Sequence, residues 1–328
     1  MASLTRVFGS SDEHAAKGVG PNVSIDVTHE QLSSQDHWLT QWSGSSENRR
    51  RQIRRFRRNR LAVVGLVIVL ILLIIAVIGP YVAPYPEDAT GAINIGERLQ
   101  APSRDHWMGT DDVGADIFSR VLIGTRLSLG IGAVVIVLAV LIGIPLGAIA
   151  GYFGGKVNEL IMRITDVFLT IPGLILALAI AAALGPSIRN AMIALSVVWW
   201  PGYCRLTQAQ FLALREEVYI EAAQTIGASS WRIIFRHVLP NTLTPIMVKI
   251  SMDLGFAILT AAGLSFIGVG AQPPSPEWGA MVSLGRKFMP EWWWYSTFPG
   301  GAIFIAVFAF NMLGDGLRDM LDPRGSNH

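Results

Sequence analysis

The sequence predicts an all-α integral membrane protein, and three observations lead to this fold class. Of its 328 residues, 51% are apolar and only 15% are charged, whereas a soluble domain carries about a quarter charged residues. The mean hydropathy of +0.44 is correspondingly high. The apolar residues also gather in runs of about 20, the length that a helix needs to cross the apolar core of a bilayer.

Six such runs predict six transmembrane helices within residues 61–318. Proline and glycine inside the runs, such as Pro145 and Pro172, are tolerated because neighbouring helices satisfy the freed backbone groups. The third and fifth runs extend backwards through charged residues, to about Glu159 and Pro245. The predicted spans are 61–84, 127–151, 167–188, 190–204 with a continuation to Leu214, 254–276 and 292–314.

The distribution of lysine and arginine predicts the orientation of these helices. With the N-terminus in the cytoplasm, 19 of the 26 basic residues lie on the cytoplasmic side, as the positive-inside rule requires. Both termini and the loop at about 211–243 are then cytoplasmic. The arginine-rich segment 49–60 directly precedes the first span, which favours a contact with anionic lipid of the membrane over a contact with nucleic acid.

Both ends of the chain are predicted to be tails outside the membrane. Residues 1–48 are polar and lack the apolar region of a cleaved signal peptide, so we expect a disordered cytoplasmic tail there. Residues 319–328 form a short C-terminal cytoplasmic tail in the same scheme.

Several kinds of chemistry are excluded by the residues present. A single cysteine, Cys204, excludes an internal disulfide and a multi-thiolate metal site. None of the six histidines stands at metal-ligand spacing with another ligand. Gly154-Gly155-Lys156 resembles a phosphate-binding loop, but Val157 replaces the serine or threonine that such a loop needs after its lysine. We therefore expect no metal, no cofactor and no ATP hydrolysis by this chain itself.

A polar insert between the fourth and fifth predicted spans has the pattern of two short helices joined by a glycine. Helix-forming residues start at Glu221-Ala222-Ala223, and Gly227 follows where a tight helix exit needs a positive φ. A second amphipathic stretch around Trp231 ends at Leu239-Pro240, where the proline is expected to stop the helix.

The insert resembles the cytoplasmic coupling loop of ABC importer permeases. That loop has the pattern Glu-Ala-Ala, three residues and Gly, and it ends in an apolar residue, any residue and Leu-Pro. The spacing from Glu221 to Pro240 fits this pattern. His237 stands in the place of the apolar residue, and this version is similar to the one in the peptide and nickel permeases of the superfamily.

Other motifs resemble the dipeptide/oligopeptide permeases, and the likeness covers about residues 49–324. Ala115 departs from that family, which usually has arginine at this position. The motifs are Trp107–Asp111 with Ser119-Arg120 and Gly124–Leu129, Leu264–Gly270 with Pro273-Pro274 and Trp278-Gly279, and Phe310–Arg324.

The resemblance implies the type I ABC importer permease fold and a place in a larger complex. The chain would be the permease subunit in the bacterial cytoplasmic (inner) membrane and would form the pathway with a second homologous permease. Two ABC ATPase subunits would drive transport through the coupling helix. An extracytoplasmic solute-binding protein would deliver the solute, most simply a di- or oligopeptide. Nickel, opines and oligosaccharides stay open as alternative solutes.

The resemblance and the charges inside the spans assign candidate residues to three roles. ATPase coupling is expected at Glu221, Ala222, Ala223, Gly227, Trp231, Leu239 and Pro240. Docking of the solute-binding protein is expected at Asp111, Asp112, Gln272, Pro273, Pro274, Glu277 and Trp278. The pathway or its gate is expected at Arg163, Asp166 and Asp253, because charges in a membrane are costly and are typical of functional sites.

Alternative interpretations remain for these features. Arg163 with Asp166, and Lys249 with Asp253, have the spacing of pairs that simply neutralise each other near the membrane surface. An ion-coupled secondary transporter would use Asp166 and Asp253, but it predicts an internal inverted repeat that the sequence does not show, and it leaves the insert unexplained. Residues 292–295, three tryptophans and a tyrosine, predict an interfacial aromatic belt.

Overall fold

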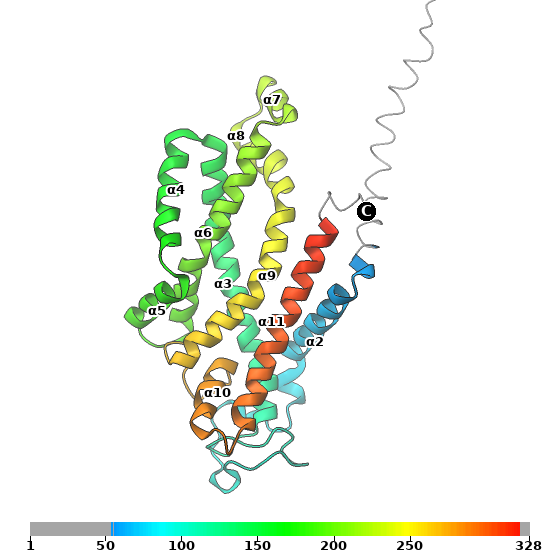
Figure 1. Cartoon of the computed structure of the whole chain (residues 1–328), viewed down its shortest axis with the longest axis vertical. Coiled ribbons are helices and arrows are strands. Elements are labelled where there is room, and N and C mark those ends of the chain that lie inside the picture. The colour runs from blue at the N-terminus through cyan, green and yellow to red at the C-terminus, as the bar shows by residue number, and fades with distance from the viewer. Residues whose placement is uncertain (1–53, 55, 322–328) are drawn as a thin grey trace, which may run out of the picture. The chain divides into compact units, whose positions relative to one another are not determined.

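The computed structural model describes residues 54 and 56–321, and this part of the chain is almost entirely helical (Figure 1). Extended segments pair within it only at a single bridge between Thr110 and Asp116. The expected tail 1–48, residues 49–53 and 55 of the basic segment, and residues 322–328 lie outside the described residues. The predicted all-α membrane fold is confirmed for the described part.

Four helices are long and apolar enough to cross a membrane, namely α2 (Arg60–Val82), α3 (Ile117–Phe153), α9 (Leu239–Ile267) and α11 (Trp294–Leu321). A bent pair, α4 (Gly155–Thr170) with α5 (Gly173–Leu184), provides a fifth candidate. The remaining predicted span is α6 (Ile188–Arg215), which is long enough but is not among the candidates by apolar content. Length and composition therefore support up to five of the six predicted spans.

Two predicted spans differ from the helices that form. The third was predicted to run unbroken through Pro172, but α4 and α5 meet there at 89°. The reason is local, because the residue before a proline avoids the helical region, and Ile171 is extended at φ −88° and ψ 130°. The fifth was predicted to reach residue 276, but α9 ends at Gly268, whose φ of +97° turns the chain out of the helix.

Shorter elements gather at the two ends of the bundle (Figure 1). At one end lies the insert (residues 216–238), which contains α7, α8 and a π-helix. At the other lies the loop cap (residues 83–116 and 268–293), which contains α10 and three 3-10 turns. Their bounds are Val218–Thr225 for α7, Ser230–Ile233 for α8, Ile234–Val238 for the π-helix η3, Trp278–Gly285 for α10, Pro86–Ala89 for η1, Ile95–Glu97 for η2 and Arg286–Phe288 for η4.

Glycines spaced four residues apart bring α3 into close contact with α6. A Cβ atom on Gly143 would lie 2.5 Å from the carbonyl oxygen of Trp200, and one on Gly147 would lie 2.4 Å from that of Cys204. Gly151 repeats the contact one turn further along, against Gln208 and Phe211. Small residues at this spacing allow two backbones to approach closely, which is a common way for helices to pack in membranes.

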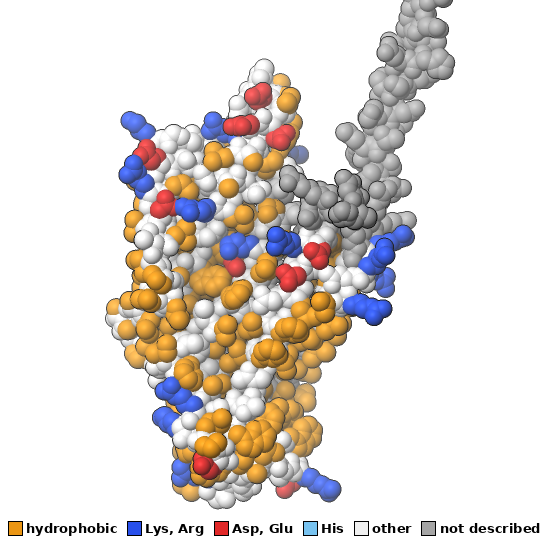
Figure 2. Space-filling model, viewed as in Figure 1, with side chains coloured by type: hydrophobic (Ala, Val, Ile, Leu, Met, Phe, Trp, Pro, Cys, Tyr) orange, Lys and Arg blue, Asp and Glu red, His pale blue; other side chains and the backbone are white. Residues whose placement is uncertain are grey.

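The surface of the bundle has the polarity expected of a membrane protein. Figure 2 shows hydrophobic side chains covering the middle of the visible face, while most lysine, arginine, aspartate and glutamate side chains lie towards the two ends. Large apolar side chains along α2, including Ile74 and Val77, are about half exposed or more. Apolar surface of this extent is favourable only when lipid covers it.

Replacing Gly147 by valine is expected to destabilise the bundle, because the added side chain would overlap the backbone of α6. Overpacking of this kind costs about 1–3 kcal/mol. Gly130→Val is the matched control, since Gly130 lies in the same helix and a Cβ atom there would meet no atom within 4 Å. Thermal unfolding of the purified chain in detergent should show a lower midpoint for Gly147→Val than for Gly130→Val, and equal midpoints would contradict the close packing.

Candidate functional site

The first half of the insert ends in a helix exit with a positive φ at Gly227. Gly227 has φ +80°, and its N–H donates to the carbonyl of Gln224 at 2.9 Å. The next N–H, of Ala228, donates to the carbonyl of Ala223 at 3.0 Å. These two bonds are the Schellman motif that closes α7. No atom lies within 4 Å of a Cβ on Gly227, so the backbone conformation alone, and not a lack of space, favours glycine, and the predicted positive φ is confirmed.

The second half of the insert continues into α9 without a break. Ser229 caps α8 by accepting a hydrogen bond from the N–H of Arg232, and the π-helix Ile234–Val238 then leads directly into α9. The prediction that Pro240 stops this helix is wrong. The helical run passes through Pro240, the second residue of α9, whose missing N–H comes directly after the wider turns of the π-helix.

The insert has a buried face and an exposed apolar face. Its buried side chains pack against the ends of α3 and α6 at Ala148 and Phe211. On the outside, Ile226 is 84% exposed, and the stacked rings of Trp231 and Phe235, 5.8 Å apart, are each about 60% exposed. Of the predicted coupling residues, Ala223 is buried and Leu239 half-buried, while the exposed ones are Glu221, Ala222, Gly227, Trp231 and Pro240.

The loop cap is held together by a buried ion pair. Arg120 Nη1 lies 2.6 Å from Asp111 Oδ2, and both side chains are at most 5% exposed. Asp111 Oδ1 also accepts hydrogen bonds from the backbone N–H groups of Val113 and Ala115. Burial raises the pKa of the Asp111 carboxyl, while Arg120 and the two N–H groups act in the opposite direction. Arg120 Nη2 reaches Pro274 O at 3.1 Å and so ties the two parts of the cap together.

A second buried carboxylate anchors α10. Glu277 is the N-cap of this helix, and its two carboxylate oxygens accept hydrogen bonds of 2.9 Å from the N–H groups of Gly279 and Ala280. Burial raises the pKa of Glu277, and these N–H groups oppose the rise. The neighbouring Trp278 is completely buried, and its indole N–H donates to the carbonyl of Val121 at 3.1 Å.

Part of the predicted docking surface is buried. The side chains of Asp111, Glu277 and Trp278 are not exposed in this conformation, and the docking role expected of them stays a prediction. Trp278 instead belongs to a buried apolar cluster with residues of α2, α3, α9 and α11. The exposed predicted residues are Gln272, Pro273 and Pro274, and Asp112 is half-buried.

The predicted aromatic belt at residues 292–295 is also only partly correct. Trp293 is about half exposed, as a residue at the membrane surface would be. Trp294 and Tyr295 are buried and face the loop cap instead. The Tyr295 hydroxyl donates to Asp112 Oδ1 at 2.8 Å, and the Trp294 indole N–H donates to the carbonyl of Thr110 at 3.3 Å.

The charged residues inside the spans form pairs that differ in part from those expected. Arg163 pairs with Glu159 on the same helix, and Asp166 pairs with Arg205 across the gap between α4 and α6, so the expected Arg163–Asp166 pair does not form. The helix spacing favoured a partner one turn away and gave no signal for Arg205. The Lys249–Asp253 pair does form, with Nζ 2.9 Å from Oδ2.

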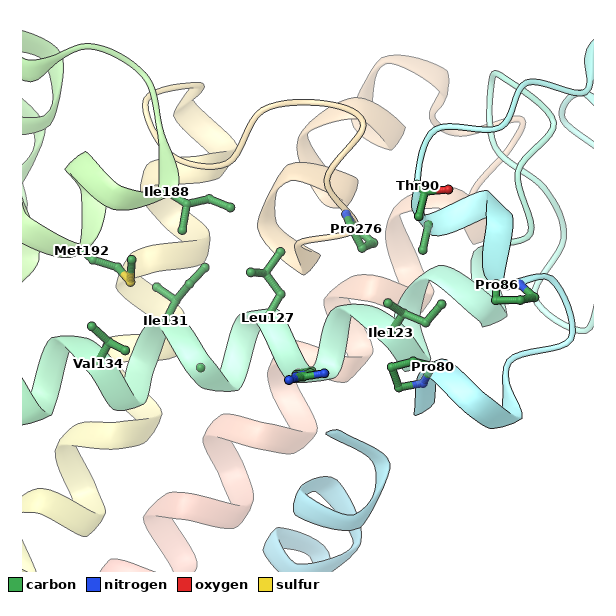
Figure 3. A pocket seen from close by; sticks show the side chains of 13 residues that line it. Pro80, Pro86, Thr90, Ile123, Leu127, Ile131, Val134, Ile188, Met192 and Pro276 are labelled. Carbon is green, nitrogen blue, oxygen red and sulfur yellow. The ribbon is translucent and has the colours of Figure 1, made fainter. Parts of the chain in front are cut away.

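Two cavities adjoin these elements. The larger, about 660 Å³, lies near the loop cap and is lined mostly by apolar side chains together with Arg126. Figure 3 shows Leu127 and Ile131 of α3 beside this space, with Met192 of α6 and Pro276 of the loop cap on other sides. The smaller, about 260 Å³, lies between the bend of α4 and α5, α6 and α9, and Lys249 is part of its lining.

Comparison with known proteins identifies the family. Residues 143–327 match the family described as "Binding-protein-dependent transport system inner membrane component". Residues 49–102 match the family described as "N-terminal TM domain of oligopeptide transport permease C". A structure titled as inward facing conformations of the MetNI methionine ABC transporter aligns with a TM-score of 0.49 at 18% identity, over 61% of this chain and 96% of that chain.

Similar proteins align over most of their length. One is the probable D,D-dipeptide transport system permease protein DdpC of Escherichia coli, 48% identical over 80% of this chain and 88% of its own. The dipeptide transport system permease protein DppC of Alkalihalophilus pseudofirmus is 42% identical over 95% of this chain and 98% of its own. The glutathione transport system permease protein GsiD of Pectobacterium atrosepticum is 45% identical over 83% and 89%. The chain therefore belongs to the family of binding-protein-dependent transport system inner membrane components.

Proposed function

We propose that this chain is the membrane subunit of an ATP-driven importer of di- or oligopeptides in the bacterial cytoplasmic membrane. The observation that carries this proposal is the exposed apolar face of the insert, formed by Ile226, Trp231 and Phe235 at the end of the bundle. An apolar surface of this kind outside the membrane is typical of a contact with another protein. The relatives named above support a peptide as the solute, since dipeptides and the tripeptide glutathione appear in their names.

The proposed partners supply what a single chain does not provide for transport: a complete pathway, an energy source and a receptor for the solute. A single bundle of this size does not enclose a pathway for a peptide, so a second homologous permease completes it. Two ABC ATPase subunits supply the energy, and one of them docks on the insert. An extracytoplasmic solute-binding protein docks on the loop cap, where Gln272, Pro273 and Pro274 are exposed. The prolines restrict the backbone, so little conformational entropy is lost on binding.

The geometry supports a direct mechanical link from the ATPase to the spans. The insert is continuous with α9 through the π-helix, and its buried face rests on α3 and α6. Movement of the insert by the ATPase would therefore move α9 and shift the bundle between packed states. ATP acts as the ligand that favours one of these states.

The alternative functions have less support. Nickel, opines or oligosaccharides would be carried by the same machinery with a different binding protein. An ion-coupled secondary transporter would use Asp166 and Asp253, but it predicts an internal inverted repeat that the sequence does not show. That class also provides no use for the exposed face of the insert.

Gly227→Val is expected to uncouple transport from ATP hydrolysis. A β-branched residue at φ +80° is strained by about 1–2 kcal/mol or more, and relief of this strain would tilt α7 away from its partner. Asparagine tolerates positive φ, so Gly227→Asn is the matched control. In the reconstituted complex, ATP hydrolysis stimulated by the loaded binding protein should fall towards the basal rate in Gly227→Val and stay near wild type in Gly227→Asn. Full stimulation in the valine variant would refute the proposed coupling role.

The insert is expected to face the cytoplasm. Single cysteines at Gln224 in the insert and Arg104 in the loop cap, both exposed, test this in a Cys204→Ala background. A membrane-impermeant thiol reagent added to intact cells or spheroplasts should label the cysteine at 104, whereas the cysteine at 224 should be labelled only after permeabilisation. The reverse pattern would overturn the orientation.

A further inference from the structure

A lysine–aspartate pair lies inside the spanning part of the chain without a role in coupling or docking. Lys249 and Asp253 are one turn apart on α9, and their charged groups are 2.9 Å from each other. A charge at this depth is costly to hold away from water. A pair kept only for stability would be no better than well-packed apolar side chains. The pair therefore calls for a function.

The Lys249 side chain is positioned by contacts with α6 but remains partly exposed. Its side chain is 31% exposed, against 12% for Asp253. The Lys249 ammonium lies 5.1 Å from the centre of the Tyr203 ring, within the range of a cation–π contact. A Cβ on Gly202 would lie 3.6 Å from the same ammonium, so the lysine crosses the backbone of α6 where a glycine leaves room for it.

Polar groups beside the pair have unused hydrogen-bonding capacity. The Tyr203 hydroxyl is buried beside Asp253. Neither this hydroxyl nor Asp253 Oδ2 has a hydrogen bond of good geometry among the described residues, and the same is true of the Thr207 hydroxyl one turn away. Such groups are uncommon in protein interiors, because each unmade bond is unfavourable. The two hydroxyl groups place polar atoms next to the Lys249–Asp253 pair in an otherwise apolar part of the bundle.

Lys249 is part of the wall of the smaller cavity, of about 260 Å³. This volume is slightly below the ~300 Å³ at which small-molecule sites begin, which suits one end of a peptide. Lys249 is the one charged side chain in the lining, and the rest of the wall is mostly apolar: Leu169, Gly173, Leu174, Leu195, Val198, Trp199, Gly202 and Thr260. A cation in an apolar cavity favours an anionic group as its ligand.

We propose that Lys249 binds the terminal carboxylate of the peptide as it crosses the membrane, and this inference rests on the proposed function. Asp253 balances the lysine charge while the cavity is empty and sets the position of the ammonium. On entry, the carboxylate accepts hydrogen bonds from the ammonium, and the last side chain of the peptide packs against Trp199. The site then distinguishes a peptide with a free carboxylate from one whose C-terminus is an amide.

The position on α9 links this site to the energy source. The second half of the insert and α9 form one continuous helical run, Ser230–Ile267, so movement of the insert carries Lys249 with it. A shift of the ammonium relative to Tyr203 and Trp199 on α6 would alter the site during the transport cycle. Binding would thus be transient, as passage of the solute requires.

The test compares trialanine with trialanine amide in liposomes that contain the full complex and its binding protein. Transport rates are measured with the binding protein saturated by either peptide, and the ratio of the two rates is compared between permease variants. Any preference of the binding protein cancels, because the same protein is used throughout. Lys249→Gln alone would leave Asp253 buried without a partner, so the main variant is Lys249→Gln with Asp253→Asn.

The ratio of the free-acid rate to the amide rate is expected to fall about tenfold in the double variant, the size of effect expected for loss of a hydrogen bond to a charged group. Lys249→Arg should keep most of the preference, because it keeps the charge. Lys156→Gln, which removes an exposed lysine on α4, should leave the ratio unchanged.

An unchanged ratio in the double variant overturns the site, including the case in which both rates fall together, since that result shows a purely structural pair. If the wild-type complex assembles but imports neither peptide, the peptide function itself is refuted and the carboxylate site falls with it. Import of both peptides with an unchanged ratio refutes the carboxylate site alone.

Discussion

Close contact between α3 and α6 is the constraint on which the other parts of this structure depend. Gly143, Gly147 and Gly151 let the two backbones approach so closely that there is no room between them for a Cβ atom at these positions. Because α3 starts at the loop cap and α6 ends at the insert, this contact fixes the distance between the two ends of the bundle. The buried face of the insert rests on the same two helices, so a force on the insert acts on the whole bundle and not on a loose loop.

Buried charges give the loop cap its rigidity. Each carboxylate that leaves water there is compensated, Asp111 by Arg120 and Glu277 by the first N–H groups of α10. Removing one partner would leave a charge buried alone, which is far less favourable than losing an exposed pair. The cap is therefore rigid, and its proline-rich segment stays exposed, as the proposed docking of a binding protein requires.

Features that depend only on residues close together in the sequence could be predicted from the sequence. The apolar runs located the spans, and the need for positive φ at Gly227 was correct because it depends on the helix exit alone. Tertiary packing decided the rest. Trp278 follows a proline-rich segment and was predicted to be an exposed anchor. It is instead buried in an apolar cluster of the bundle, where its N–H donates to the carbonyl of Val121 on α3. Pro145 stays inside a helix whereas Pro172 breaks one; both follow an isoleucine, but only Pro172 is followed by a glycine, and Pro-Gly is a common turn signal.

The proposed binding of an ATPase subunit to the exposed face of the insert is tested most directly by site-specific photocrosslinking. A photoreactive amino acid at Ile226, 84% exposed on the insert, is compared with one at Ile95, 76% exposed on the loop cap, in native membranes. Mass spectrometry of the adducts should identify an ABC ATPase subunit at position 226 and not at position 95. Adducts at 226 that contain no ATPase, or the same partner at both positions, would contradict the account.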